Sequence, residues 1–124
     1  MNISHIGIAV RNIEQALLFF RLLGGSEEGE KTAYPEFGMN SQQVRIGDGS
    51  IELMEPLGET GLIAEFLRKH GEGVHHIALR AADLDRTAGY FREMNIRCIG
   101  PEEGSGHFFI HPRDAHSILI EIHG

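Results

Sequence analysis

The chain repeats itself at an offset of 71 residues. His5-Ile6-Gly7-Ile8 aligns with His76-Ile77-Ala78-Leu79, and Phe19-Phe20-Arg21 aligns with Tyr90-Phe91-Arg92. A repeat of this length predicts two similar supersecondary units. Because a copy of roughly 55 residues can hardly bury a sufficient core alone, we expect both copies to form one domain over residues 1–124. Module one is expected at about 1–55, a connector at 56–73 and module two at about 74–124.

Each copy predicts a strand, a helix and three further strands. Alternating apolar residues predict the opening strands at 3–10 and 74–81, and Asn12 and Asp83 are suitable N-caps for the helices that follow. The later strands are expected at 27–33, 42–46 and 51–55 in the first copy and at 97–99, 106–111 and 117–122 in the second. The predicted fold class is therefore α+β, with two βαβββ modules that form a curved, mostly antiparallel sheet around a cleft.

The connector contains a short amphipathic stretch at 61–70. Its apolar side chains share one helical face, so we expect it to pack against the domain. These residues are Leu62, Ile63, Phe66 and Leu67.

Side chains alternate between the two faces of a strand, and this separates polar from apolar residues here. In the opening strands, Ile6, Ile8 and Ile77 point to the helix side, whereas His5 and His76 point to the other side. In the last strand of each copy, Glu52 and Glu121 also point away from the helices. The sequence therefore predicts one His and one Glu on the helix-free face of each module.

Four such residues repeated in this way suggest a metal site. A solvated polar face is the ordinary explanation for any one of them, but the repeat pairs His5 with Glu52 and His76 with Glu121 at nearly equal separations of 47 and 45 residues. Two imidazoles and two carboxylates suit one divalent transition ion such as Co, Zn, Ni or Mn.

Predicted hairpins extend the site. A two-residue turn at Asp48-Gly49 would place Arg45 opposite Glu52, where it either holds a substrate carboxylate or forms a cross-strand ion pair with Glu52. In the second copy, the expected register places His107 opposite Glu121. His107 is then either a proton-transfer residue or an exposed loop histidine.

Several stretches resemble one family specifically. They are residues 5–10, 51–58, 71–78, 111–114 and 118–121, which include Glu-Pro-Leu-Gly at 55–58 and His-Pro-Arg-Asp at 111–114. The chain resembles the vicinal oxygen chelate (glyoxalase/bleomycin resistance) superfamily, and within it is most similar to methylmalonyl-CoA epimerases. This resemblance implies that the two βαβββ modules form a glyoxalase-like fold.

The resemblance implies a metal-dependent epimerase that acts on methylmalonyl-CoA or a similar 2-acyl thioester through an enolate. The resemblance implies that His5, Glu52, His76 and Glu121 are the metal ligands, and that Glu121 also acts as a catalytic base. Ser41 stands where some family members have a second carboxylate base. A glyoxalase I-like isomerase and a non-catalytic resistance-type binding protein are the alternatives. The resemblance also suggests a homodimer.

Charge and composition narrow the partners. Eleven Lys and Arg against eighteen Asp and Glu leave a net charge of −7, which argues against nucleic acid or an anionic membrane as the partner. The sequence contains no apolar run long enough to span a bilayer and no signal-peptide pattern at its start. Cys98 is the only cysteine, so no internal disulfide forms. We expect a cytoplasmic protein that binds a small molecule.

Overall fold

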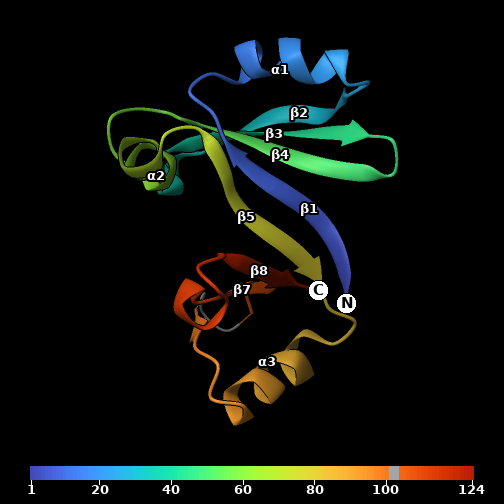
Figure 1. The fold of residues 1–124 in the computed structure, drawn as a ribbon, viewed down its shortest axis with the longest axis vertical. Helices are drawn as coiled ribbons and strands as arrows, with labels where there is room; N and C mark the ends of the chain where they lie inside the picture. Colours follow the sequence, from blue (N-terminus) through green and yellow to red (C-terminus); the bar gives the residue numbers. More distant parts are fainter. Residues whose placement is uncertain (101–103) are drawn as a thin grey trace. The chain divides into compact units, whose positions relative to one another are not determined.

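The computed structural model describes residues 1–100 and 104–124 (Figure 1). Two compact units are distinguished: one consists of residues His5–His75, and the other of Met1–Ser4 with His76–Gly124. We call them the N-terminal and C-terminal units. Both contain the predicted order of strand, helix and three strands, which confirms the α+β class and the two βαβββ modules.

The first module contains β1 (Asn2–Ala9), α1 (Ile13–Leu22), β2 (Ser26–Tyr34), β3 (Met39–Ile46) and β4 (Gly49–Pro56), followed by the connector helix α2 (Leu62–His70). The order of its strands across the sheet is β2-β3-β4-β1. The β2–β3 and β3–β4 pairs are antiparallel, and β1 pairs with β4 in parallel.

The second module contains β5 (Gly73–Arg80), α3 (Leu84–Glu93), β6 (Cys98–Ile99), β7 (His107–Ile110) and β8 (Ile120–His123). Its strand order is β5-β8-β7-β6, again with one parallel pair, β5–β8, and two antiparallel pairs. A short 3-10 helix, η2 (Pro112–Asp114), lies between β7 and β8.

The predicted caps begin both module helices. The Asn12 side chain accepts the Gln15 N–H at 2.9 Å, and the Asp83 side chain accepts the Arg86 N–H at 3.0 Å. Each bond satisfies one of the N–H groups that a helix leaves unpaired at its start.

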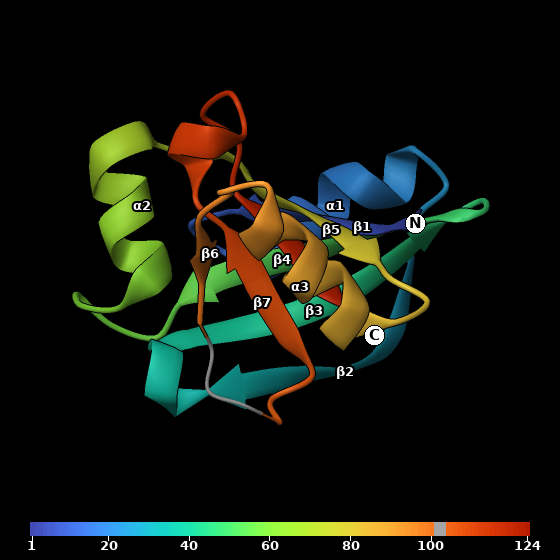
Figure 2. The ribbon, with the colours of Figure 1, turned by 90° about the horizontal axis from the view of Figure 1, so that it is seen from below.

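The module helices α1 and α3 cover one face of their own half-sheets (Figure 1, Figure 2). Under α1, Val10, Val44 and Leu53 form a buried core with Ile13 and Leu17 of the helix. Under α3, a second core is formed by Ala81, Ala88, Phe108, Ile110 and Ile122. We call the opposite face of each half-sheet its site face, because the predicted ligands alternate onto it.

The connector helix packs as expected, on the site face of the N-terminal unit. Ile63 of α2 joins Ala9, Met39 and Met54 in a third buried cluster. The prediction was wrong for Leu62, which is 46% exposed, because the buried stripe runs through Ile63 and Ala64 instead.

The first predicted hairpin register was wrong by two residues. Ile46 pairs with Gly49, so the two turn residues are Gly47 and Asp48, and Arg45 lies opposite Ser50 rather than Glu52. Gly47 has φ +57°, and a positive φ at the first central position is what a type II′ turn requires and what glycine adopts without strain.

The second predicted register was wrong in the same way. His107 lies opposite His123, and Phe109 lies opposite Glu121. The error arose because β8 starts later than the alternating pattern indicated. Residues 115–117 form a turn after η2, 118–119 have no regular structure, and His116 and Ser117 have positive φ values. Because each shift is an even number of residues, Arg45 and His107 stay on the faces that were predicted for them.

No helix in the described part of the chain is long and apolar enough to cross a membrane.

Candidate functional site

The two modules place their His and Glu residues in the same register. In the parallel pair β1–β4, Gly7 lies opposite Glu52, and in β5–β8, Ala78 lies opposite Glu121. His5 and His76 each precede that small residue by two positions, so each histidine shares a face with the glutamate on the neighbouring strand. The match was predicted from the repeat, and the strand pairing confirms it within each unit.

In the N-terminal unit, two predicted ligands lie side by side. His5 Nε2 is 3.5 Å from Glu52 Oε1, and the two side chains are 16% and 15% exposed. Partly buried donors that remain open to solvent on one side are suited to an ion that also takes substrate or water oxygens.

Ser41 supports this pair from the neighbouring strand β3. Its hydroxyl donates a hydrogen bond to Glu52 Oε2 at 2.7 Å, and the residue is only 5% exposed. This bond fixes the orientation of the carboxylate, so that Oε1 is the oxygen nearer His5. Such a partner is typical of the support that metal-binding carboxylates receive.

His75 lies close to this group as well. Its ring packs edge-on against Phe66 of α2, with ring centroids 5.0 Å apart. Burial lowers the pKa of His75 below its ordinary value, although the nearby Glu52 carboxylate opposes this shift and His70 adds to it. His75 is therefore held neutral near the site, in contact with the connector helix.

Arg45 does not pair with Glu52. Its Nε donates to Glu28 Oε2 at 3.2 Å, and Nη1 donates to the Asp48 carbonyl at 3.5 Å. The alternative of an ion pair with Glu52 was therefore wrong, because the register places Arg45 opposite Ser50, two residues along β4 from Glu52, and its side chain reaches Glu28 of β2 instead. A substrate-binding role for Arg45 stays a prediction.

Sequence reasoning overlooked a carboxylate on β2. The β2–β3 register shifts between Glu28 and Thr32, and Gln42 Nε2 donates to the Gly29 carbonyl at this irregularity. Thr32 lies opposite Ser41 on the site face, and alternation from Thr32 places Glu30 on the same face. Bulges commonly redirect side chains next to active sites.

Lys31 provides an independent check on this placement. Its Nζ is 3.9 Å from Glu14 of α1 and 3.9 Å from Glu55, so it points to the α1 face. Its neighbour Glu30 therefore points to the site face, where it is exposed. The run Glu27-Glu28-Gly29-Glu30 was the available signal, but the sequence does not show that the β2–β3 register shifts between Glu28 and Thr32.

In the C-terminal unit, His76 and Glu121 lie on adjoining strands. His76 is 4% exposed, and Ile77 N donates to the Leu119 carbonyl beside it. Phe109 lies opposite Glu121, and His107 lies two residues away along β7, opposite His123.

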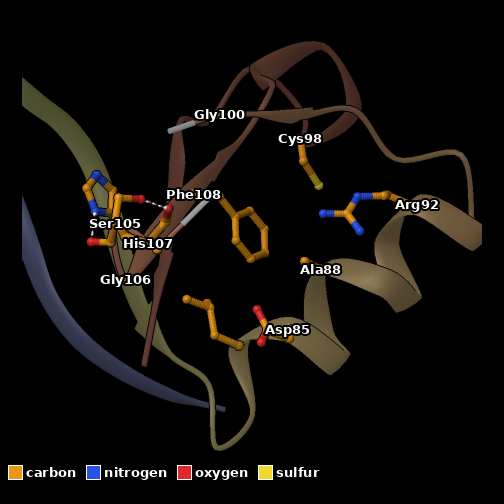
Figure 3. Close-up of a pocket in the computed structure, with 11 residues that line it drawn as sticks. Asp85, Ala88, Arg92, Cys98, Gly100, Ser105, Gly106, His107 and Phe108 are labelled. Carbon is orange, nitrogen blue, oxygen red and sulfur yellow. Dashed lines mark hydrogen bonds between the residues drawn. The ribbon is translucent and has the colours of Figure 1, made fainter. Parts of the chain in front are cut away.

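His107 is held by its own loop. Its Nδ1 lies 3.4 Å from the Ser105 carbonyl, and its ring meets Phe109 edge-on at 5.7 Å. Figure 3 shows its imidazole on the opposite side of β7 from the Phe108 ring, which points towards α3. The structure thus keeps His107 on the site face but not directly opposite Glu121.

A pocket of about 550 Å³ lies on the α3 side of this unit (Figure 3). Cys98 and Arg92 point into it. Burial raises the pKa of the Cys98 thiol, although Arg92 partly opposes the rise. Because this pocket lies on the helix face, it is separate from the site face that carries Glu121.

The donor set fits a divalent ion. Within the N-terminal unit, an imidazole nitrogen and a carboxylate oxygen are already close together, and Ser41 satisfies the second carboxylate oxygen. The C-terminal unit offers the same two donor types in the same register. Mixed nitrogen and oxygen donors of this kind suit Co, Zn, Ni or Mn.

Comparison with known proteins agrees with these features. Residues 4–111 match the model of the glyoxalase/bleomycin resistance protein/dioxygenase superfamily. The Bos taurus mitochondrial methylmalonyl-CoA epimerase is 31% identical, over 97% of this chain and 72% of its own length. The Cereibacter sphaeroides ethylmalonyl-CoA/methylmalonyl-CoA epimerase is 32% identical, over 97% of this chain and 95% of its own length.

A solved structure is similar over nearly the whole chain. It is a variant of the Streptomyces coelicolor methylmalonyl-CoA epimerase in complex with 2-nitronate-propionyl-CoA, with 32% identity and a TM-score of 0.86. The similarity covers 98% of this chain and 95% of that one. These relatives are isomerases, and the chain belongs to the glyoxalase/bleomycin resistance protein/dioxygenase superfamily.

Proposed function

We propose that this chain is a metal-dependent epimerase of methylmalonyl-CoA or a similar 2-acyl thioester. His5, Glu52, His76 and Glu121 are the proposed ligands of one divalent ion. The observation that carries the proposal is the repeated register, Gly7 opposite Glu52 and Ala78 opposite Glu121, which gives each module the same pair of donors. The named relatives, which are epimerases of such thioesters, support the choice of substrate.

The reaction removes a proton from the carbon between a thioester and a carboxylate and returns one to the opposite side. The barrier is the negative charge that builds on the thioester oxygen as the proton leaves. A divalent ion at this site would supply Lewis-acid stabilisation of that charge. The protein residues must then supply a base on each side of the carbon.

Glu121 is the proposed base on one side, in addition to its role as a ligand. For the other side, Glu30 and His107 are the two candidates. Glu30 is an exposed carboxylate on the site face of the N-terminal unit, the face that carries the His5–Glu52 pair. His107 lies on the site face of the C-terminal unit, two residues along β7 from the partner of Glu121.

Ser41 is not proposed as a base. Its hydroxyl already donates to Glu52, and a serine without a basic partner is a poor base at neutral pH. We propose instead that it positions the Glu52 carboxylate.

Arg45 is the residue proposed to bind the substrate carboxylate. Its ion pair with Glu28 would orient the guanidinium for that role.

Proton NMR of methylmalonyl-CoA in D2O tests the function directly. We expect rapid loss of the α-proton signal with protein loaded with Co²⁺ or Zn²⁺, and no loss above the protein-free control after excess chelator. If metal is bound but the α-proton does not exchange, the epimerase proposal is wrong and glyoxalase-like substrates become the next test.

The homodimer and the cytoplasmic location stay predictions. Sedimentation tests the first, and cell fractionation tests the second.

A further inference from the structure

The two units differ in whether their arginine side chains form ion pairs with carboxylates. In the N-terminal unit, every arginine forms an ion pair with a carboxylate, as does Lys31, whereas Lys69 forms none with the described residues; the arginines are Arg11, Arg21, Arg45 and Arg68. The C-terminal unit contains five arginines, and none of them forms an ion pair with a residue among 1–100 and 104–124. They are Arg80, Arg86, Arg92, Arg97 and Arg113. In an acidic protein, exposed arginines that no described carboxylate pairs with are suited to binding an external anion.

One of these arginines, Arg97, lies on the site face of the C-terminal unit. The β6–β7 ladder pairs Cys98 with Ile110, and the His111 N–H donates to the Arg97 carbonyl at 2.8 Å, which extends the pairing by one residue. Alternation from the pair Ile99–Phe109 places Arg97 and His111 on the face of Glu121. Arg97 is exposed, so its guanidinium is accessible from this face.

The loop after β7 adds a third donor. The Arg113 N–H donates to His111 Nδ1 at 3.1 Å, so the neutral His111 ring carries its proton on Nε2 and acts there as a donor. The Arg113 side chain is exposed. Asp114 belongs to the same loop, and its Oδ2 accepts the Arg97 backbone N–H at 2.7 Å, which ties the loop to β6. We call Arg97, His111 and Arg113 the Arg97 patch.

We propose that the Arg97 patch binds the phosphate groups of the coenzyme A part of the substrate. This inference rests on the proposed function and adds the means by which the coenzyme is recognised. Guanidinium groups match phosphate oxygens in a two-point geometry, and His111 adds a neutral donor.

The position of the patch agrees with the shape of a CoA thioester. Arg97 is two strands and two residue steps away from Glu121, roughly 12 Å between Cα atoms for ordinary sheet spacing. In coenzyme A, the pantetheine arm separates the thioester from the phosphates, so the phosphates cannot lie beside the reacting carbon. A cationic group farther along the same face is where they would fall.

Steady-state kinetics with two substrates tests the proposal. Methylmalonyl-CoA carries the phosphates, whereas methylmalonyl-pantetheine has the same reacting group without the nucleotide. We expect R97Q and R113Q each to raise KM for methylmalonyl-CoA roughly 10-fold with kcat unchanged, because such contacts bind the ground state and the transition state equally. Neither variant should change KM for methylmalonyl-pantetheine.

R86Q is the matched control, since Arg86 is an exposed α3 arginine outside the patch and also without an ion pair among the described residues. It should leave both KM values unchanged. Equal KM increases for both substrates in R97Q and R113Q, or no increase for methylmalonyl-CoA, would overturn the proposal.

Calorimetry separates this inference from the proposed function. If the wild-type protein epimerises neither substrate, the function fails, and binding of free coenzyme A is then compared with binding of pantetheine. Tighter binding of coenzyme A that R97Q and R113Q reduce roughly 10-fold would still support the patch. Equal binding of coenzyme A and pantetheine would refute it.

Discussion

The Ser41 hydroxyl lies 2.7 Å from Glu52 Oε2, while the other carboxylate oxygen of Glu52 faces His5. This arrangement predicts that S41A weakens divalent metal binding by roughly 10-fold, because a freed carboxylate must be ordered again when the ion binds. Titration with Co²⁺, followed by absorbance and calorimetry, measures the change. S50A, at a half-buried position on the same hairpin, is the control and should bind metal like the wild type. Equal affinity in S41A and the wild type would show that Ser41 does not position Glu52.

Replacement of the second base should stop epimerisation without stopping all proton exchange. We expect E30Q to slow the conversion of one epimer into the other by roughly 100-fold, while Glu121 still exchanges the α-proton of one epimer in D2O. H107Q is measured in parallel, with NMR for exchange and a coupled assay for inversion. If H107Q gives this result and E30Q is active, His107 is the second base instead.

Glu55 links the first helix to the sheet. Its Oε1 accepts the Ile13 N–H at 2.7 Å, and its Oε2 accepts Asn40 Nδ2 at 2.8 Å. E55A leaves both donors without this acceptor, so we expect the free energy of unfolding to fall by about 1–3 kcal/mol. Urea denaturation provides the measurement, with E59A, an exposed glutamate on the following loop, as the control. A loss no larger than that of E59A would contradict the role of Glu55.

The loop before β8 contains two adjacent residues in the left-handed region, His116 with φ +55° and Ser117 with φ +68°. Because a side chain is disfavoured there, S117G should stabilise the protein by about 1 kcal/mol. A115G, two residues earlier in the loop and at φ −133°, should destabilise the protein instead, since glycine only adds unfolded-state entropy there. Thermal unfolding measures the change in stability of each variant. A lower Tm in S117G than in the wild type would show that the backbone at Ser117 is not strained.

Cys98 should react slowly with alkylating reagents at neutral pH. Burial raises the pKa of its thiol above the ordinary 9.0, so the reactive thiolate forms only at higher pH. The rate of iodoacetamide labelling, followed by mass spectrometry, should rise with a midpoint above that of a free cysteine. Because Arg92 lowers the pKa of the thiol, R92Q should move the midpoint higher still. A midpoint below 9.0 in the wild type would show that burial is not the dominant influence.

Local features of the fold could be predicted from the sequence. The offset of 71 residues predicted two βαβββ modules, and Asn12 and Asp83 cap the two helices as their residue types suggested. Alternation also assigned Glu52 and Glu121 to the correct faces, because strand side chains have a period of two. These features depend on short-range geometry, which neighbouring residues largely determine.

The strand pairing and the bonds across it were decided only by the tertiary structure. A turn at Gly47-Asp48 instead of Asp48-Gly49 moved Arg45 away from Glu52, and a two-residue shift separated His107 from Glu121. A shift by two residues keeps every face unchanged, so the hydrophobic pattern cannot detect it. The hydrogen bond from Ser41 to Glu52, the placement of Glu30 at the β2 bulge, and the approach of Arg97 to His111 join residues far apart in sequence. Such contacts depend on the register and bulges of paired strands, which the packing of the whole sheet determines.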